Sequence, residues 1–174
     1  MDYRRLNADT VKDSYPLPRI DDILINLRGK KFFASLDLLS GYMQIGVHPE
    51  DRKKTAFVTH RGLFVFNRMP FGLCNAPVSF QRLMDSLFEG HLGHDTLVYL
   101  DDLLMFAETE DELLHILNRN LQILARAGLK CKPRKCKLFC DSIHYLGYVI
   151  SAKGVAAEQE KSIKSEPGLS RKQA

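Results

Sequence analysis

The sequence predicts an α+β fold whose central sheet is a split βαβ unit of the ferredoxin-like type. Apolar runs typical of strands occur near residues 31–36, 96–100, 103–106 and 131, and helical spacing of apolar residues follows Asn75 and Thr109. From residue 31 to residue 131 the order is strand, insertion, helix, strand, strand, helix, strand. That order predicts an antiparallel sheet with its helices on one face.

The elements before residue 70 are short. Residues 20–27 have the apolar spacing of a helix, and Gly29 stands at the expected C-cap. Residues 31–36 predict the first strand, which ends on Asp37. Residues 44–47 and 55–59 are expected to be short strands, and residues 63–66 should return as a hairpin partner for 55–59.

The later helices carry clear end signals. Asn75 can act as an N-cap, with Pro77 in the first turn, and Thr109 with Glu112 forms a capping box. Residues 138–139 and 143–150 predict a further hairpin. We expect residues 155–174 to form a divergent, disordered tail, because large apolar side chains are few there.

Composition narrows the class of protein. The chain has 174 residues, 45% of them hydrophobic and 26% charged, which is ordinary for a globular domain. Its apolar runs are too short for a membrane-spanning helix, and no secretory signal is visible, so we expect an intracellular protein with reduced cysteines. The net charge of +4 permits a polyanionic partner without requiring one. The spacing of Cys131, Cys136, Cys140 and His144 is not that of a structural zinc site.

Three aspartates are the strongest chemical signal. Asp101-Asp102 stands between two apolar strands at hairpin spacing, where Asn-Gly or Asp-Gly is the favoured pair. Two adjacent like charges in such a turn are costly, although Asp is also a common turn residue. Asp37 ends a neighbouring strand. We therefore expect the three carboxylates to meet at one sheet edge, where two Mg²⁺ ions about 3.5–4 Å apart would serve phosphoryl transfer.

Eight motifs, in order and at family-like spacing, make the chain resemble the reverse transcriptase domain of a gypsy-type LTR retrotransposon. They are DYRRLN (2–7), YPLP (15–18), SLDL with SGY (35–42), KTAF (54–57), MPFGL (69–73), NAP with FQ (75–81), YLDD (99–102) and YLG (145–147). The resemblance implies a right-hand polymerase palm with partial fingers and no thumb. Residues 1–30 and 43–75 would be fingers, and residues 31–42 and 76–154 would be palm.

The resemblance also implies roles for individual residues. Asp37, Asp101 and Asp102 match the catalytic aspartates, and the implied metal-binding set is these three with Leu38. The cofactor would be two Mg²⁺ ions, for which Mn²⁺ can substitute. Lys135 resembles the lysine that acts as general acid toward pyrophosphate.

The implied substrate-binding residues each have a plainer interpretation. Tyr42 matches the aromatic side chain that excludes a 2′-hydroxyl, and it could instead be an ordinary half-buried ring. Phe71 and Gly72 match the loop under the incoming nucleotide, or they form a buried loop anchor. Gln81 and Arg4 match positions near the template, or they are solvated side chains.

Leu146 and Gly147 resemble the hairpin that grips the primer, and an edge hairpin with alternating apolar residues fits equally well. The implied partners are a primed RNA or DNA template and a dNTP, with no membrane. Thumb, RNase H and integrase parts are missing from this chain. Two functions stay open: an RNA-directed DNA polymerase core, and an inactive or co-opted retrotransposon fragment that binds nucleic acid or a partner chain without catalysis.

Overall fold

The structure is a computed structural model that describes residues 1–19, 25, 27 and 29–157. Its helices are α1 (Arg4–Asp9), α3 (Ala76–Leu87) and α4 (Glu110–Arg126), and its 3-10 turns are η1 (Gly41–Gln44), η2 (Arg52–Thr55) and η3 (Pro133–Lys135). The strands are β1 (Phe32–Asp37), β2 (Phe57–Thr59), β3 (Gly62–Phe64), β4 (Thr96–Tyr99), β5 (Asp102–Ala107), β6 (Lys137–Cys140), β7 (Ser142–Tyr145), β8 (Tyr148–Ser151) and β9 (Gly154–Ala157). The helix expected over 20–27 lies almost wholly outside the described residues.

The central sheet confirms the predicted topology. Its four strands lie in the order β4-β5-β1-β6, and every neighbouring pair is antiparallel. The chain visits them in the order β1, α3, β4, β5, α4, β6, which is the split βαβ arrangement. The last strand begins at Lys137 and not near residue 131, where Cys131 makes a single bridge with Leu38.

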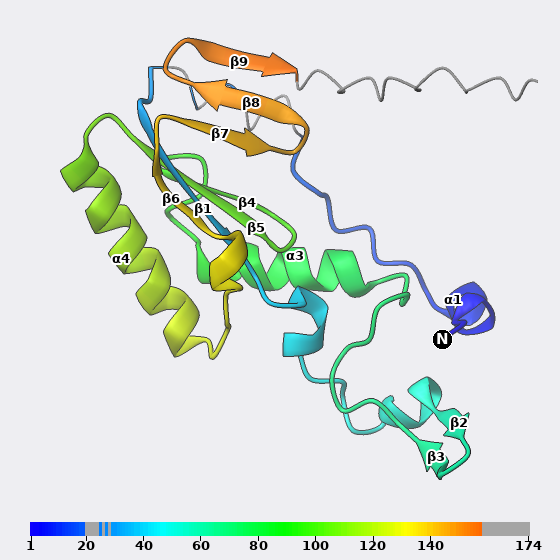
Figure 1. Cartoon of the computed structure of the whole chain (residues 1–174). Coiled ribbons are helices and arrows are strands. Elements are labelled where there is room, and N and C mark those ends of the chain that lie inside the picture. Colours follow the sequence, from blue (N-terminus) through cyan, green and yellow to red (C-terminus); the bar gives the residue numbers. More distant parts are fainter. Residues whose placement is uncertain (20–24, 26, 28, 158–174) are drawn as a thin grey trace, which may run out of the picture.

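Both faces of this sheet are covered (Figure 1). Helices α3 and α4 pack on one face, where their buried side chains meet those of β1 and β5 such as Leu36, Leu103 and Met105. A three-stranded sheet, β7-β8-β9, covers the other face and packs Ile143 and Ile150 against Leu104 and Phe106. Burial on both faces explains why β5 is a continuous apolar run without alternation.

The helix ends follow the capping signals in part. The Thr109 hydroxyl accepts a hydrogen bond from the Glu112 amide at 3.3 Å, as the capping box predicts. Asn75 occupies the N-cap of α3, but its side chain caps nothing there. It instead accepts from the Asp13 amide and donates to the Val11 carbonyl, and it thereby binds the N-terminal segment to the start of α3.

Two expectations were wrong, and one helix was missed. Residues 44–47 do not form a strand, because the Gln44 side chain bonds across the loop to the Leu39 and Lys130 backbone and only Gly46 bridges to Arg68. Helix α1 was not anticipated. Residues 155–157 belong to β9, where Val155 pairs with Ile150, so the tail begins no earlier than residue 158 and its remainder lies outside the described residues.

The β2–β3 hairpin is confirmed and lies apart from the central sheet (Figure 1). Stacking of Phe57 on Phe64, with ring centroids 5.8 Å apart, stabilises it locally. Within the described ranges, no helix has the length and apolar character needed to cross a membrane.

Candidate active site

Asp37 and Asp102 lie directly opposite each other on two neighbouring strands of the central sheet. They are direct antiparallel partners at the ends of β1 and β5, so their side chains share one face, with Cβ atoms roughly 4.5–5.5 Å apart. Burial first, and then the charges of Asp101 and Asp37, raise the pKa of Asp102. The contribution of Asp101 and Asp37 to this shift means that both carboxylates lie near that of Asp102.

The turn between β4 and β5 differs by one residue from the prediction. Tyr99 pairs with Asp102, so the two-residue connection is Leu100-Asp101 and not Asp101-Asp102. Leu100 takes the left-handed backbone with φ of 54°, at a position where hairpin turns favour glycine. A non-glycine residue held there costs on the order of 1–3 kcal/mol, and such strain persists only where surrounding structure fixes it.

Gln81 on α3 fixes this turn. The Leu100 amide donates to Gln81 Oε1 at 2.7 Å, and Gln81 Nε2 donates to Asp85 Oδ1 at 2.7 Å and to the Val98 carbonyl at 3.3 Å. Gln81 has 0% exposure, so the interpretation of Gln81 as a solvated side chain is wrong. The predicted position of Gln81 near the template stays a prediction. Its observed contacts position the turn that carries Asp101.

A small cavity of about 170 Å³ lies beside this turn and is lined by Gly41, Tyr42, Phe71 and Asp101. It brings two of the predicted substrate-binding residues next to a predicted catalytic one. The Tyr42 ring packs against Phe71, with centroids 5.5 Å apart, and against Phe80 at 5.7 Å. Burial, and then the charge of Asp101, raise the pKa of Tyr42, so its hydroxyl stays neutral beside the carboxylate.

Gly41 also lines this cavity, and the sequence reasoning did not single it out. A Cβ atom there would lie 3.0 Å from the Phe80 ring and 3.1 Å from the Asp101 Cβ. Any larger residue would therefore push Phe80 or Asp101 away by a few tenths of an ångström, and glycine lets the η1 turn approach the β4–β5 turn this closely. The available signal was its place in the SGY motif, directly before Tyr42.

Phe71 and Gly72 form an exposed loop over the cavity. Phe71 is 57% exposed, so the interpretation of Phe71 as a buried anchor is wrong. Gly72 has φ of 95°, and its carbonyl accepts a hydrogen bond from Asn7 Nδ2 at 2.8 Å. Arg4, on the same helix as Asn7, is exposed and forms an ion pair with Asp2 at 2.6 Å.

Lys135 lies at the carboxylate cluster. Its Nζ donates to Asp37 Oδ2 at 2.8 Å, and the Asp37 carboxylate raises the pKa of Lys135. Over the described part of the chain, no three His, Cys, Asp or Glu side chains are arranged as a formed metal-binding group. Asp37 lies opposite Asp102, and Asp101 precedes Asp102 in the chain. Among the described residues, the oxygens of the three carboxylates do not surround one point, and Asp37 is bound to Lys135.

Leu38 contributes backbone to the cluster. Its side chain is 1% exposed and has no atom that binds a metal, so only its carbonyl could serve as a ligand. The Leu38 amide donates to the Asp101 carbonyl at 3.0 Å, and this bond ties the end of β1 to the β4–β5 turn.

Leu146 and Gly147 form the two-residue turn of the β7–β8 hairpin, with φ of 50° and 81°. The neighbouring Tyr145 is buried, and its hydroxyl donates to the Asp102 carbonyl at 3.4 Å. Tyr145 was not among the predicted site residues. Its contact links this hairpin to the strand that carries Asp102.

Two features lie outside this cluster. A larger cavity of about 230 Å³, walled by α1, η2 and the start of α3, contains none of the predicted site residues. All four cysteines are free thiols. Burial, and then Cys136, raise the pKa of Cys131 to about 11, so this thiol stays protonated at neutral pH.

The chain is similar to known proteins along most of its length. The model of the family described as "Reverse transcriptase (RNA-dependent DNA polymerase)" matches residues 1–150. The Pol polyprotein of the Drosophila melanogaster transposon gypsy is 40% identical over 161 residues, which are 92% of this chain and 16% of that protein. The enzymatic polyprotein of cauliflower mosaic virus (strain Strasbourg) is 40% identical over 151 residues, covering 86% of this chain and 22% of its own length.

A solved structure is similar as well. The foamy viral protease-reverse transcriptase in complex with an RNA/DNA hybrid superposes with a TM-score of 0.85 at 28% identity. The match covers 95% of this chain and 23% of that one. The chain therefore spans less than a quarter of each of these relatives.

Proposed function

The chain belongs to the reverse transcriptase family, and we propose that it forms the core at which an RNA-directed DNA polymerase joins a dNTP to a primer. In this reaction the primer 3′-oxygen attacks the α-phosphorus of the dNTP. The bond to the β-phosphate breaks, and pyrophosphate leaves. The observation that supports the proposal most is the cavity shared by Tyr42, Phe71 and Asp101, next to the Asp37–Asp102 pair.

The donor set suits divalent cations with a preference for oxygen. Asp37, Asp101 and Asp102, with the Leu38 carbonyl, would hold two Mg²⁺ ions once Lys135 releases Asp37. The ions would supply Lewis-acid stabilisation of the attacking and leaving oxygens. Lys135 already places one positive charge on Asp37, and the carboxylates of Asp101 and Asp37 contribute, after burial, to the raised pKa of Asp102, so a cation at the cluster would be favoured.

The chain's own residues would orient the substrate. Tyr42 would lie against the sugar and leave no room for a 2′-hydroxyl, which would select dNTP over rNTP. Phe71 and Gly72 would lie under the incoming base. Lys135 would protonate the pyrophosphate as it leaves, which requires hydrogen-bonding reach, and its Nζ already lies 2.8 Å from a cluster carboxylate.

The remaining assignments follow the family pattern. Residues 1–30 and 43–75 would be part of the fingers, with Arg4 near the template, and residues 31–42 and 76–154 would be the palm. The Leu146-Gly147 turn would hold the primer end, since Tyr145 connects its hairpin to Asp102. Nucleic acid is the proposed partner, in keeping with the RNA/DNA hybrid bound by the similar foamy viral enzyme.

Primer extension by the purified chain tests this function. With an annealed RNA template, dNTPs and Mg²⁺ or Mn²⁺, we expect metal-dependent products that fall by at least about 100-fold in Asp101→Asn. Asp111→Asn is the matched control, because Asp111 lies exposed in the first turn of α4. Equal extension by both variants would contradict the role of Asp101.

The non-catalytic alternative predicts a different result. Binding of primer-template without extension, under conditions in which a longer relative extends, would support a fragment that binds nucleic acid only. A gel-shift measurement on the same samples separates these outcomes, because binding is scored whether or not a product forms.

A further inference from the structure

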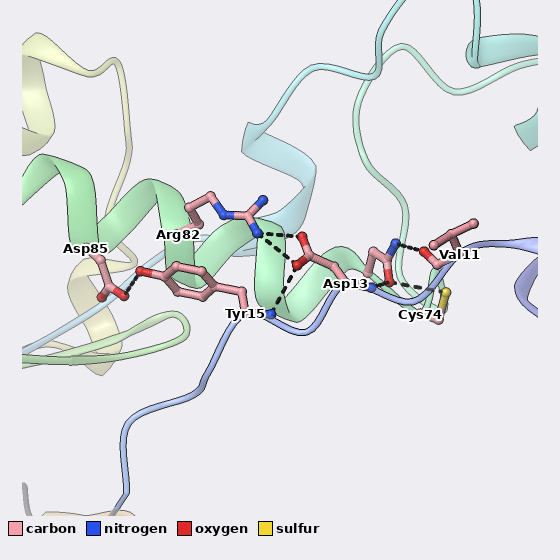
Figure 2. Close-up of polar contacts among 7 residues, drawn as sticks. Val11, Asp13, Tyr15, Cys74, Arg82 and Asp85 are labelled. Atoms are coloured by element: carbon pink, nitrogen blue, oxygen red, sulfur yellow. Dashed lines mark hydrogen bonds and ion pairs between the residues drawn. The ribbon is translucent and has the colours of Figure 1, made fainter.

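The N-terminal strap, defined as residues 11–15, is fastened to α3 by side-chain bonds (Figure 2). Arg82 donates to both Asp13 oxygens at 2.7 and 2.8 Å, and its guanidinium lies 4.8 Å over the Tyr15 ring. Tyr15 OH donates to Asp85 Oδ2 at 2.6 Å. The strap thus crosses α3 at the helical turn that also carries Gln81.

The same Asp85 carboxylate serves both the strap and the active-site turn. Its Oδ2 accepts from Tyr15, and its Oδ1 accepts from Gln81 Nε2 at 2.7 Å. Gln81 Oε1 in turn accepts from the Leu100 amide at 2.7 Å. Three short hydrogen bonds therefore connect a partly exposed tyrosine to the strained residue directly before Asp101.

Each link in this chain of bonds is directional. An amide side chain can present either its oxygen or its nitrogen, and the acceptor at Asp85 makes Gln81 direct its nitrogen there and its oxygen toward Leu100. Tyr15 holds the carboxylate in place through the second oxygen. Without these partners, the buried Gln81 nitrogen would keep only its longer bond to the Val98 carbonyl, at 3.3 Å, and the amide would be held less firmly.

We propose that Tyr15 and Asp85 are positioning residues that act through Gln81 to hold Leu100 at positive φ and so direct Asp101 into the catalytic site. This proposal rests on the function proposed above. It assigns the strap a role in the reaction rate, although the strap does not line the cavity beside Asp101 and forms no hydrogen bond with Asp37, Asp101 or Asp102. Docking of residues 11–15 and the geometry of the β4–β5 turn would then change together.

Tyr15→Phe tests the proposal with the smallest change, because the ring stays under Arg82 and only the hydroxyl is lost. The matched control is Tyr3→Phe. Among the described residues, the buried Tyr3 hydroxyl has no hydrogen-bond partner, so its removal breaks nothing. The first measurement is the amide resonance of Leu100 in leucine-labelled protein. We expect this proton to move upfield and broaden in Tyr15→Phe and to stay unchanged in Tyr3→Phe.

The second measurement is steady-state primer extension. We expect kcat to fall about 10-fold in Tyr15→Phe, while KM for dNTP stays within about twofold, because the misplaced group acts in the chemical step. An unchanged Leu100 resonance would overturn the coupling. A changed resonance with unchanged kcat would overturn the positioning role. If the wild-type chain does not extend primers at all, the function proposed above fails, while the resonance still tests the coupling.

Variants at Asp85 check the direction of the bonds. Asp85→Leu removes both acceptors, so Tyr15→Phe should have no added effect on the Leu100 resonance in that background. Asp85→Asn retains one oxygen for Gln81 and offers its amide to the Tyr15 oxygen, so it should restore most of the resonance position. Additive effects of Tyr15→Phe and Asp85→Leu would contradict a single connected chain.

Discussion

Two hairpin turns next to the carboxylates each begin with a leucine at positive φ, and they differ in the residue that follows and in the contacts that hold the turn. In the β4–β5 turn Leu100 has φ of 54°, and in the β7–β8 turn Leu146 has φ of 50°. The second residue of the β7–β8 turn is Gly147, with φ of 81°, which glycine adopts without steric cost. The second residue of the β4–β5 turn is Asp101, and a buried glutamine bonds the turn in place.

The difference separates a turn set by local sequence from one set by tertiary contact. In the β7–β8 turn both residues have positive φ, and glycine fills the second position, so local sequence meets that part of the requirement while Leu146 stays strained. In the β4–β5 turn only Leu100 has positive φ, and its amide is bonded by Gln81, 19 residues earlier in the chain. Strain held from outside is typical of functional sites, where the required side chain conflicts with the preferred turn.

The largest effect should follow loss of the tertiary support. Gln81→Leu leaves the Leu100 amide without its partner, so we expect the free energy of unfolding to fall by about 2 kcal/mol in urea titrations. The control Gln122→Leu changes an exposed side chain on α4 and should stay within about 0.5 kcal/mol of wild type. Equal values for the two variants would contradict external support of the β4–β5 turn.

A smaller effect should follow loss of the local support. Gly147→Ala meets no atom within 4 Å, so its cost is the backbone conformation alone, about 1 kcal/mol in the same titration. Gly46→Ala is the control, since that glycine also faces open space and its φ is not positive. If both alanine variants unfold at the same urea concentration, the β7–β8 turn does not depend on its glycine.

The smallest effect concerns charge at the β4–β5 turn. Because the folded-state pKa of Asp102 is raised, its contribution to stability is present at low pH and is lost as pH rises through that value. Asp102→Asn should therefore raise the free energy of unfolding slightly at pH 7, and the gain should shrink as the pH is lowered to acidic values. Urea titrations across that range test this, and a gain that grows toward low pH would contradict the repulsion.

The sequence predicts what depends on periodicity and local chemistry. The order of the sheet and helices, the capping box at Thr109 and the meeting of β1 with the β4–β5 hairpin all follow from apolar spacing and turn residues. Tyr42 and Phe71 were named for substrate binding by the family resemblance alone. They line one cavity with Asp101, and their role there stays a prediction.

What the sequence missed depends on partners distant in the chain. Nothing near Gln81 indicates that its side chain is buried under the Leu100 amide, and nothing near Asn75 indicates that it bonds to the strap instead of capping α3. The one-residue shift of the β4–β5 turn has the same origin, because the Gln81 bond stabilises positive φ at a leucine that local preference would reject. Gly41 differs from these cases, because the glycine itself is visible in the sequence. Its close approach to Asp101 is visible only in the structure.

The central claim is that Asp37, Asp101 and Asp102 together bind divalent cations at one edge of the sheet. Paramagnetic broadening of backbone amides by a small amount of Mn²⁺ tests it without requiring activity. We predict that the amides of Asp37, Leu38, Asp101 and Asp102 broaden first, and that this pattern disappears in Asp101→Asn. Broadening that instead centres on the acidic first turn of α4, Glu110 to Glu112, and survives Asp101→Asn would contradict the claim.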